Sequence, residues 1–316
     1  MRTSVRPCRI LLALLLLAVA LDSRAADASP ARSNRRIQVA VVAERADQGL
    51  LLPLPTPDRP AYFVAWDGGC IQEGDHSTTE PSSPAAPIAR ALRESLASQH
   101  YLPAAAHAVP SLLVIYHWGL VNRNAHQVAS LADVDPNLKA RLALVATAEQ
   151  AGEIENFLMN RLQGRTNAAY RIPENLSVQA RRILDLTRHA RWFMAVSAYD
   201  YDALTRHQPK LVWRVKMSTD QRADLTMAEA LPVLLRAGGP FFGRHAEVPQ
   251  ILAAPLLSAD EGAAAASISE ETSLSPEAAK QVDRADLRNL IRQERAAFSW
   301  LRAAQGQTKS LEAESK

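Results

Sequence analysis

The sequence predicts an α+β protein in which a mixed, largely antiparallel sheet of about five strands is packed by helices. Three observations predict this class. Apolar, partly alternating segments recur along the chain; helical patterns lie between them; and a polar connection over 200–210 joins two strand candidates as an antiparallel hairpin. The 316-residue chain is long enough to bury a large core without disulfides. We expect one main domain over residues 35–257.

The strands are predicted from their alternation and from the residues that end them. The expected strands are 37–42, 62–66, 111–118, 192–199 and 211–217. The third is the most apolar and is expected to be buried on both faces. Asp67, Gly68 and Gly69 are expected to stop the second. In the last strand, Trp213 should face the core and Arg214 should point the other way, so Arg214→Ala should cost far less stability than Trp213→Ala.

The helices are predicted from apolar residues at three-and-four spacing. We expect a helix over 88–100 and a helical insertion over about 120–190. The insertion should contain helices near 137–163, interrupted at Gly152, and near 175–189. A further helix is expected over 226–237, bent at Pro232.

The N-terminus has the three-part pattern of a secretory signal peptide over residues 1–25. Arginines precede an apolar run of 12 residues, Ile10–Leu21, and small residues follow. The run is too short to cross a bilayer, which needs roughly 20 residues. We expect cleavage after Ala25, a flexible mature N-terminus over 26–34, no transmembrane segment after cleavage, and a periplasmic or extracellular location.

The C-terminal region changes in composition after the main domain. Residues 258–274 are small, acidic and rich in Ala and Ser, which is typical of a flexible linker. Ser275 and Pro276 then open an amphipathic helix expected over 275–304, followed by a disordered tail over 305–316. This helix either docks on its own domain, the alternative we favour, or binds an envelope protein partner.

The charge of the mature chain argues against nucleic-acid binding. The full sequence has 36 Lys and Arg against 33 Asp and Glu. Four of these basic residues and one acidic residue lie in residues 1–25, so the mature chain has equal numbers of each. A nucleic-acid partner requires a basic surplus, which this chain lacks.

Candidate site residues occur at strand ends, where sites in α/β proteins gather. Asp67, His117 and Cys70 are weak candidates for an acid, a base and a nucleophile, although no spacing rule supports a triad. The simpler interpretations are a hydrogen-bonded core histidine and a half-buried cysteine in a Gly-rich turn. Tyr199, with the three residues after it, resembles a cation or sugar platform, but a polar hairpin end is the simpler interpretation. No motif predicts a metal or cofactor site.

Several stretches resemble a lipoprotein-like bacterial envelope domain of unknown function. They are Trp66-Asp67, Tyr101-Leu102-Pro103, 112–118 and Lys210–Arg214; the chain departs from that domain in its missing lipid-attachment cysteine and its helical insertion. The Tyr-His-Trp-Gly and Gly-Pro-Phe-Phe-Gly-Arg stretches are also similar to uncharacterised secreted bacterial proteins. These resemblances imply an exported protein but no activity. We expect a non-catalytic binding or scaffold protein; the alternative is a hydrolase with a strand-end site near Asp67 and His117.

Overall fold

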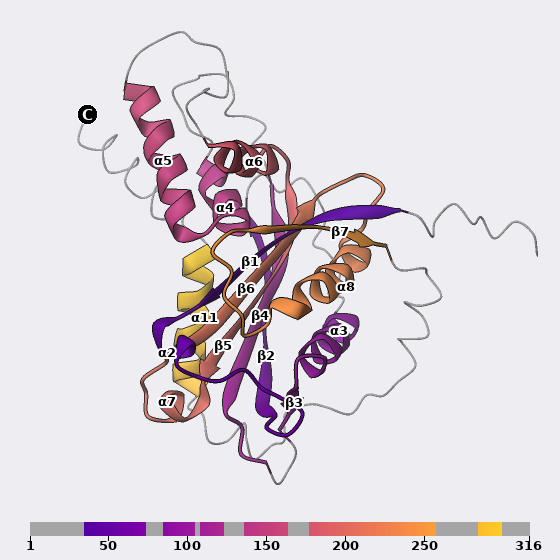
Figure 1. Cartoon of the computed structure of the whole chain (residues 1–316), viewed down its shortest axis with the longest axis vertical. Coiled ribbons are helices and arrows are strands. Elements are labelled where there is room, and N and C mark those ends of the chain that lie inside the picture. Colours follow the sequence, from indigo (N-terminus) through magenta and orange to yellow (C-terminus); the bar gives the residue numbers. More distant parts are fainter. Residues whose placement is uncertain are drawn as a thin grey trace, which may run out of the picture.

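The computed structural model describes residues 35–73, 85–104, 108–122, 136–163, 177–256 and 284–298. Its centre is one twisted sheet with helices on both faces (Figure 1). The strands follow the order β3-β2-β4-β5-β6-β1-β7. Their bounds are β1 (Arg36–Arg45), β2 (Ala61–Glu73), β3 (Tyr101–Pro103), β4 (Leu112–Val121), β5 (Arg191–Asp200), β6 (Leu211–Asp220) and β7 (Gln250–Pro255).

The α+β class is confirmed, but the sheet has seven strands and not about five. Strand β2 pairs in parallel with β3 and β4, and the other four pairings are antiparallel. The two unpredicted strands lie at the edges of the sheet. β3 has only three residues, and β7 ends in Ala-Ala-Pro, so neither has the β-branched, alternating pattern of a strand.

One face of the sheet is covered by α3 (Ala85–Ala97) and α8 (Met227–Gly238), which contact each other. Helix α8 begins with a capping box between Thr226 and Glu229 and contains Pro232 in its interior, as predicted. The core beneath these helices includes Trp213, which stacks on Phe242 at 5.4 Å between ring centroids. We call this side the α3/α8 face.

The opposite face is covered in two parts (Figure 1). The predicted insertion supplies α4 (Pro136–Val145), α5 (Ala148–Gln163) and α6 (Val178–Leu186) at one end. The break between its first two helices falls at Ala146 and Thr147, not at Gly152, because the Thr147 and Gln150 side chains cap the start of α5. At the other end lie α7 (Tyr201–Thr205) and α11 (Arg284–Phe298).

Strand β2 does not stop at Asp67, contrary to expectation. It continues through Gly68 and Gly69 to Glu73, with a register shift against β4 between Asp67 and Gly69. Gly69 has a φ of 87°, a conformation that other residues rarely adopt. The two glycines therefore mark a β-bulge and not a strand end.

The C-terminal helix docks on the main domain, as favoured from the sequence. Leu287 and Leu290 of α11 are buried against Ile115 and Tyr199 of the sheet. The expected signal peptide, the linker over 258–274 and the Ser275-Pro276 cap lie outside the described residues. Within the described ranges, none of the helices has the length and apolar character needed to span a membrane.

Candidate functional site

A row of polar side chains lies on the sheet face beneath α11. Residues two apart on one strand point to the same face, which places Ser197 and Tyr199 of β5 together. In the register of the sheet, Ser197 lies opposite Arg214 of β6, and both point away from the α3/α8 face. His117 of β4, opposite Ala195, completes the row and is fully buried. Helix α11 covers all of these groups.

Glu294 of α11 enters this row and is only 2% exposed. Its carboxylate accepts hydrogen bonds from the hydroxyls of Ser197, at 3.1 Å, and Tyr199, and from Nη2 of Arg214. Nε of Arg214 also donates to the Ser197 hydroxyl at 2.9 Å. Burial raises the pKa of Glu294 to about 7, and the hydrogen bond from Ser197 acts in the opposite direction. The cluster is a satisfied, buried polar network that joins α11 to two strands.

The next residue of α11 contacts the β-bulge. Arg295 donates from Nε and Nη2 to the carbonyl oxygen of Gly68, at 3.1 and 2.7 Å. Gly68 is required here because a Cβ at this position would lie 2.1 Å from Cε1 of His117. The bulge thus lets the imidazole of His117 and the guanidinium of Arg295 approach the same piece of backbone.

His117 is held in its neutral form by this environment. Burial, and after it the positive charges of Arg295 and Arg214, together lower the pKa of His117 to about 4, against a smaller raising effect of the Gly68 and Gly69 backbone. A histidine with so low a pKa is not protonated at neutral pH. His117 is therefore better interpreted as a core residue than as a general base.

Acid should weaken the folded state through His117. The unfolded chain binds this proton with a pKa near the ordinary 6.5, so stability is complete above that pH and falls between 6.5 and about 4. The shift corresponds to about 3 kcal/mol. We expect His117→Phe to reduce the fall in urea midpoint between pH 7.5 and 4.5.

Two comparisons isolate this effect. Glu294 acts in the opposite direction, because a raised carboxyl pKa favours the folded state at lower pH. The effect of His117 is therefore measured as the difference in pH dependence between His117→Phe and the parent protein, since the pH dependence of one protein alone also contains the contribution of Glu294. The exposed His189 provides the matched control, and His189→Gln should keep the parent's pH dependence. An undiminished fall in His117→Phe would contradict the assignment.

The structure does not bring Asp67, His117 and Cys70 together. The Asp67 carboxylate accepts from the backbone N–H of Gly69 at 2.8 Å and lies beside the hydroxyl of Tyr116, whose pKa it helps to raise after burial. Tyr116 and Cys70 belong to the α3/α8 face, whereas His117 points to the other. Neighbouring residues on a strand alternate in direction, so the candidate triad is wrong.

The Tyr199–Asp202 segment is divided between two structural roles. Tyr199 is buried and donates to Glu294. Asp200 caps α7 by accepting from the N–H of Ala203 at 2.8 Å. Asp202 is exposed and pairs with Arg206. The segment lies at the end of the β5–β6 pair, but Tyr199 and Tyr201 are buried, so its side chains do not all face water as the simpler interpretation has it. The described residues contain no cluster of side chains suited to a metal ion.

Sequence reasoning missed Ser197, Arg214, Glu294 and Arg295. The useful signal was present in Gly68-Gly69, since paired glycines inside a strand indicate that something approaches its backbone closely. The partner on α11 could not be identified in this way. Glu294 lies in a run of charged residues and looks like any solvated helix position.

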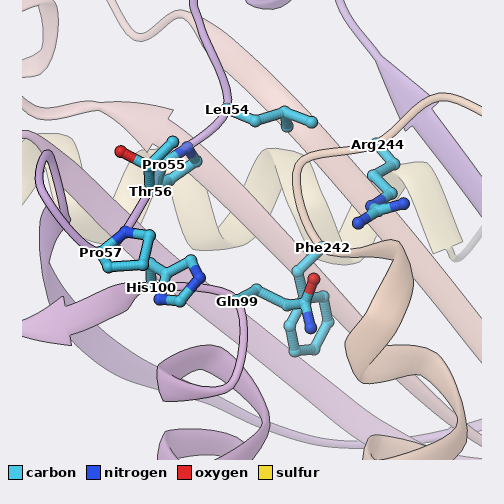
Figure 2. A pocket seen from close by; sticks show the side chains of 8 residues that line it. All are labelled: Leu54, Pro55, Thr56, Pro57, Gln99, His100, Phe242 and Arg244. Atoms are coloured by element: carbon cyan, nitrogen blue, oxygen red, sulfur yellow. The ribbon is translucent and has the colours of Figure 1, made fainter.

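Two solvent-accessible cavities lie away from the α11 region, beside the segment that follows α2 (Asp47–Leu50). One cavity of about 180 Å³ is bounded by Leu54 and Pro57, by Gln99 and His100, and by Arg244 (Figure 2). Figure 2 shows these side chains converging from three separate segments, with Phe242 at the base. A second cavity of about 230 Å³ shares Leu54 with the first. Both are open and small.

Comparisons with known proteins add little. No known protein family and no curated protein matches the sequence. Among solved structures, the chain is similar to a PDZ domain protein from Parabacteroides distasonis, with a TM-score of 0.36 and 8% identity, covering 71% of this chain and 40% of that one. A PelC dodecamer from Paraburkholderia phytofirmans gives a TM-score of 0.27 and 8% identity, covering 66% of this chain and 99% of that one. Likenesses this weak assign the chain to neither protein's family.

Proposed function

We propose that the protein is an exported, non-catalytic binding protein of the bacterial cell envelope, and that it recognises a polypeptide partner at the segment after α2. The signal-peptide pattern supports export. The alternative, a hydrolase near Asp67 and His117, has less support because these side chains belong to opposite faces of the sheet. The buried polar groups under α11 are also engaged with one another and covered from solvent.

The observation that carries the proposal is a group of exposed leucines. Leu50, Leu51, Leu52 and Leu54 are 54, 86, 45 and 42% exposed. An exposed apolar group of this kind is typical of an interaction surface. We call these four residues the leucine segment.

The leucine segment is held firmly at its base, although its side chains are exposed. The N–H of Ala46 donates to the carbonyl of Val212 on β6 at 3.1 Å, and the guanidinium of Arg45 donates to the carbonyl of Leu52 at 2.6 Å. Gly49 lies so close to β6 that a Cβ would be 2.0 Å from the Val212 oxygen. A backbone that is already held in place loses little conformational entropy on binding, which favours recognition.

The cavities beside the leucine segment indicate the chemistry of the partner. Sites for drug-sized ligands usually measure about 300–1,000 Å³, and both cavities are smaller. They are large enough for single side chains. Arg244 and His100 add basic groups to the rim of the first. An apolar polypeptide segment with a nearby carboxylate fits these features.

A site-specific photocrosslinker tests this proposal in intact cells. A crosslinking amino acid at Leu51 is expected to capture one defined envelope polypeptide. The same amino acid at Val178, which is 79% exposed on α6, serves as the matched control and should not capture it. Arg244→Glu should reduce capture at Leu51 by weakening the basic rim.

Two results would contradict the proposal. Equal capture from both positions would mean that the leucine segment has no special partner. Binding of the purified protein to phospholipid vesicles, lost in Leu51→Asp, would assign the segment to a membrane surface instead of a polypeptide.

A further inference from the structure

The strand surface under α11 differs in chemistry from the α3/α8 face. The α3/α8 face is covered by apolar packing around residues such as Trp213 and Met217. Under α11, two leucines and the half-buried Ile291 supply the apolar contacts, and Ser197, Tyr199 and Arg214 supply polar ones. We call Ser197, Tyr199 and Arg214 the carboxylate slot.

A buried ion pair is a poor means of holding a helix permanently. Removing two charges from water costs about as much as their attraction returns, so apolar packing of similar volume is often as stable or more so. In some proteins such a pair supplies specificity and not stability. Here a carboxylate at the position of Glu294 satisfies all three residues of the slot.

The residues of α11 define the pattern that the slot accepts. Leu287, Leu290 and Ile291 lie seven, four and three positions before Glu294, which puts all four on one helical face. The positions between them, such as Arg288 and Arg292, are exposed. The complementary ligand is thus an amphipathic helix with the pattern Leu-x-x-Leu-Ile-x-x-Glu.

The covalent connection makes α11 a tethered ligand. The described chain leaves the sheet at residue 256 and resumes at 284, so 27 residues connect the two. Because α11 and the sheet belong to one chain, the docking of α11 is intramolecular. A separate helix therefore binds this face only if its affinity is high enough to displace α11, or if a substitution has already displaced α11.

We propose that the sheet face under α11 is a recognition site for an amphipathic helix of a partner protein that presents a carboxylate to Arg214, Ser197 and Tyr199, and that α11 is its built-in competitor. This proposal is independent of the leucine segment. Arg214 offers a positive group on this face, and charge complementarity favours a helix that presents a carboxylate at the position of Glu294.

The test uses the full chain with α11 displaced. Leu290→Asp places a charge in the apolar contact of α11 and leaves the slot unaltered; Glu294→Arg is a second variant that repels α11 from Arg214. Gln293→Arg is the matched control, because Gln293 is exposed and α11 should stay docked. Circular dichroism verifies that each variant keeps its sheet.

The probe is a fluorescent helical peptide that keeps the two leucines, the isoleucine and the glutamate but has unrelated residues elsewhere. We expect Leu290→Asp and Glu294→Arg chains to bind it at least about tenfold more tightly than the parent and Gln293→Arg chains. A peptide with Gln in place of its Glu should bind about tenfold more weakly. Arg214→Met in the Leu290→Asp chain should remove this preference.

Three outcomes would overturn the proposal. Failure of the folded Leu290→Asp chain to bind the peptide would mean that the face does not recognise a helix in trans. Equal binding of the Glu and Gln peptides would mean that the slot does not select a carboxylate. Dimers of the parent protein in sedimentation, lost in Glu294→Arg, would assign the site to a second copy of this chain.

Discussion

Trp213→Ala is expected to lower the free energy of unfolding by about 3–5 kcal/mol. The indole is 1% exposed and lies between two other aromatic rings, with Phe242 at 5.4 Å and Tyr101 at 5.6 Å between centroids. Truncation removes the largest side chain that is fully buried among the described residues and leaves a cavity that the paired strands cannot close. Urea unfolding followed by circular dichroism measures the loss.

The matched control for Trp213→Ala lies just before the same strand. Lys210 is exposed, and Lys210→Ala should change stability by less than about 0.5 kcal/mol. A loss of similar size in both variants would show that Trp213 does not belong to the α3/α8 core.

Arg214→Met is expected to weaken the docking of α11 by about 3 kcal/mol. Above about pH 7, where Glu294 is ionised, the change leaves its carboxylate buried without its cation, and breaking one side of a buried ion pair costs about 3–5 kcal/mol. Because Arg214 contacts α11 through Glu294, the loss should appear first in that helix. Hydrogen exchange of the α11 amides should accelerate before that of the strands.

Two further variants make this expectation specific. Arg292→Met removes an exposed arginine from α11 and should leave exchange unchanged. Adding Glu294→Leu to Arg214→Met should restore much of the protection, because an apolar pair of similar volume can replace a buried ion pair. Unchanged protection in Arg214→Met would contradict the role given to this residue.

The strand over 211–217 shows how far the sequence leads. Its alternation correctly places Trp213 and Val215 in the core. The same alternation correctly points Arg214 away from that core, which predicts that Arg214→Ala costs far less than Trp213→Ala. It does not show that Glu294, 80 residues further along, contacts Arg214 on the second face. A period of two assigns residues to faces but does not tell whether water or a later helix lies on the second face.

The Asp67–Gly69 segment illustrates a second limit. Glycines after an acidic residue are typical of a turn, and the sequence was interpreted in that way. In the structure, ten residue pairs join β2 to β4 across this point. Arg295 donates a hydrogen bond to the carbonyl oxygen of Gly68, and the His117 ring lies where a Cβ of this residue would be. A bulge and a turn have the same local composition, and only the pairing strand distinguishes them. The candidate triad was wrong for a related reason: residues on neighbouring strands can point to opposite faces of the sheet, as Asp67 and His117 do.

The position of β1 has a consequence for the order of folding. It is the first strand along the chain, yet it lies between β6 and β7, so that Ala40 pairs with Ser218 and Ile251. These paired residues are far apart in the sequence, and contacts of this kind raise the contact order of a protein and slow its folding. During synthesis, β1 is made first and stays unpaired until β6 and β7, which contain its partners, have left the ribosome. Such unpaired edges favour aggregation, so the nascent chain should depend on chaperones until residues 250–255 are available.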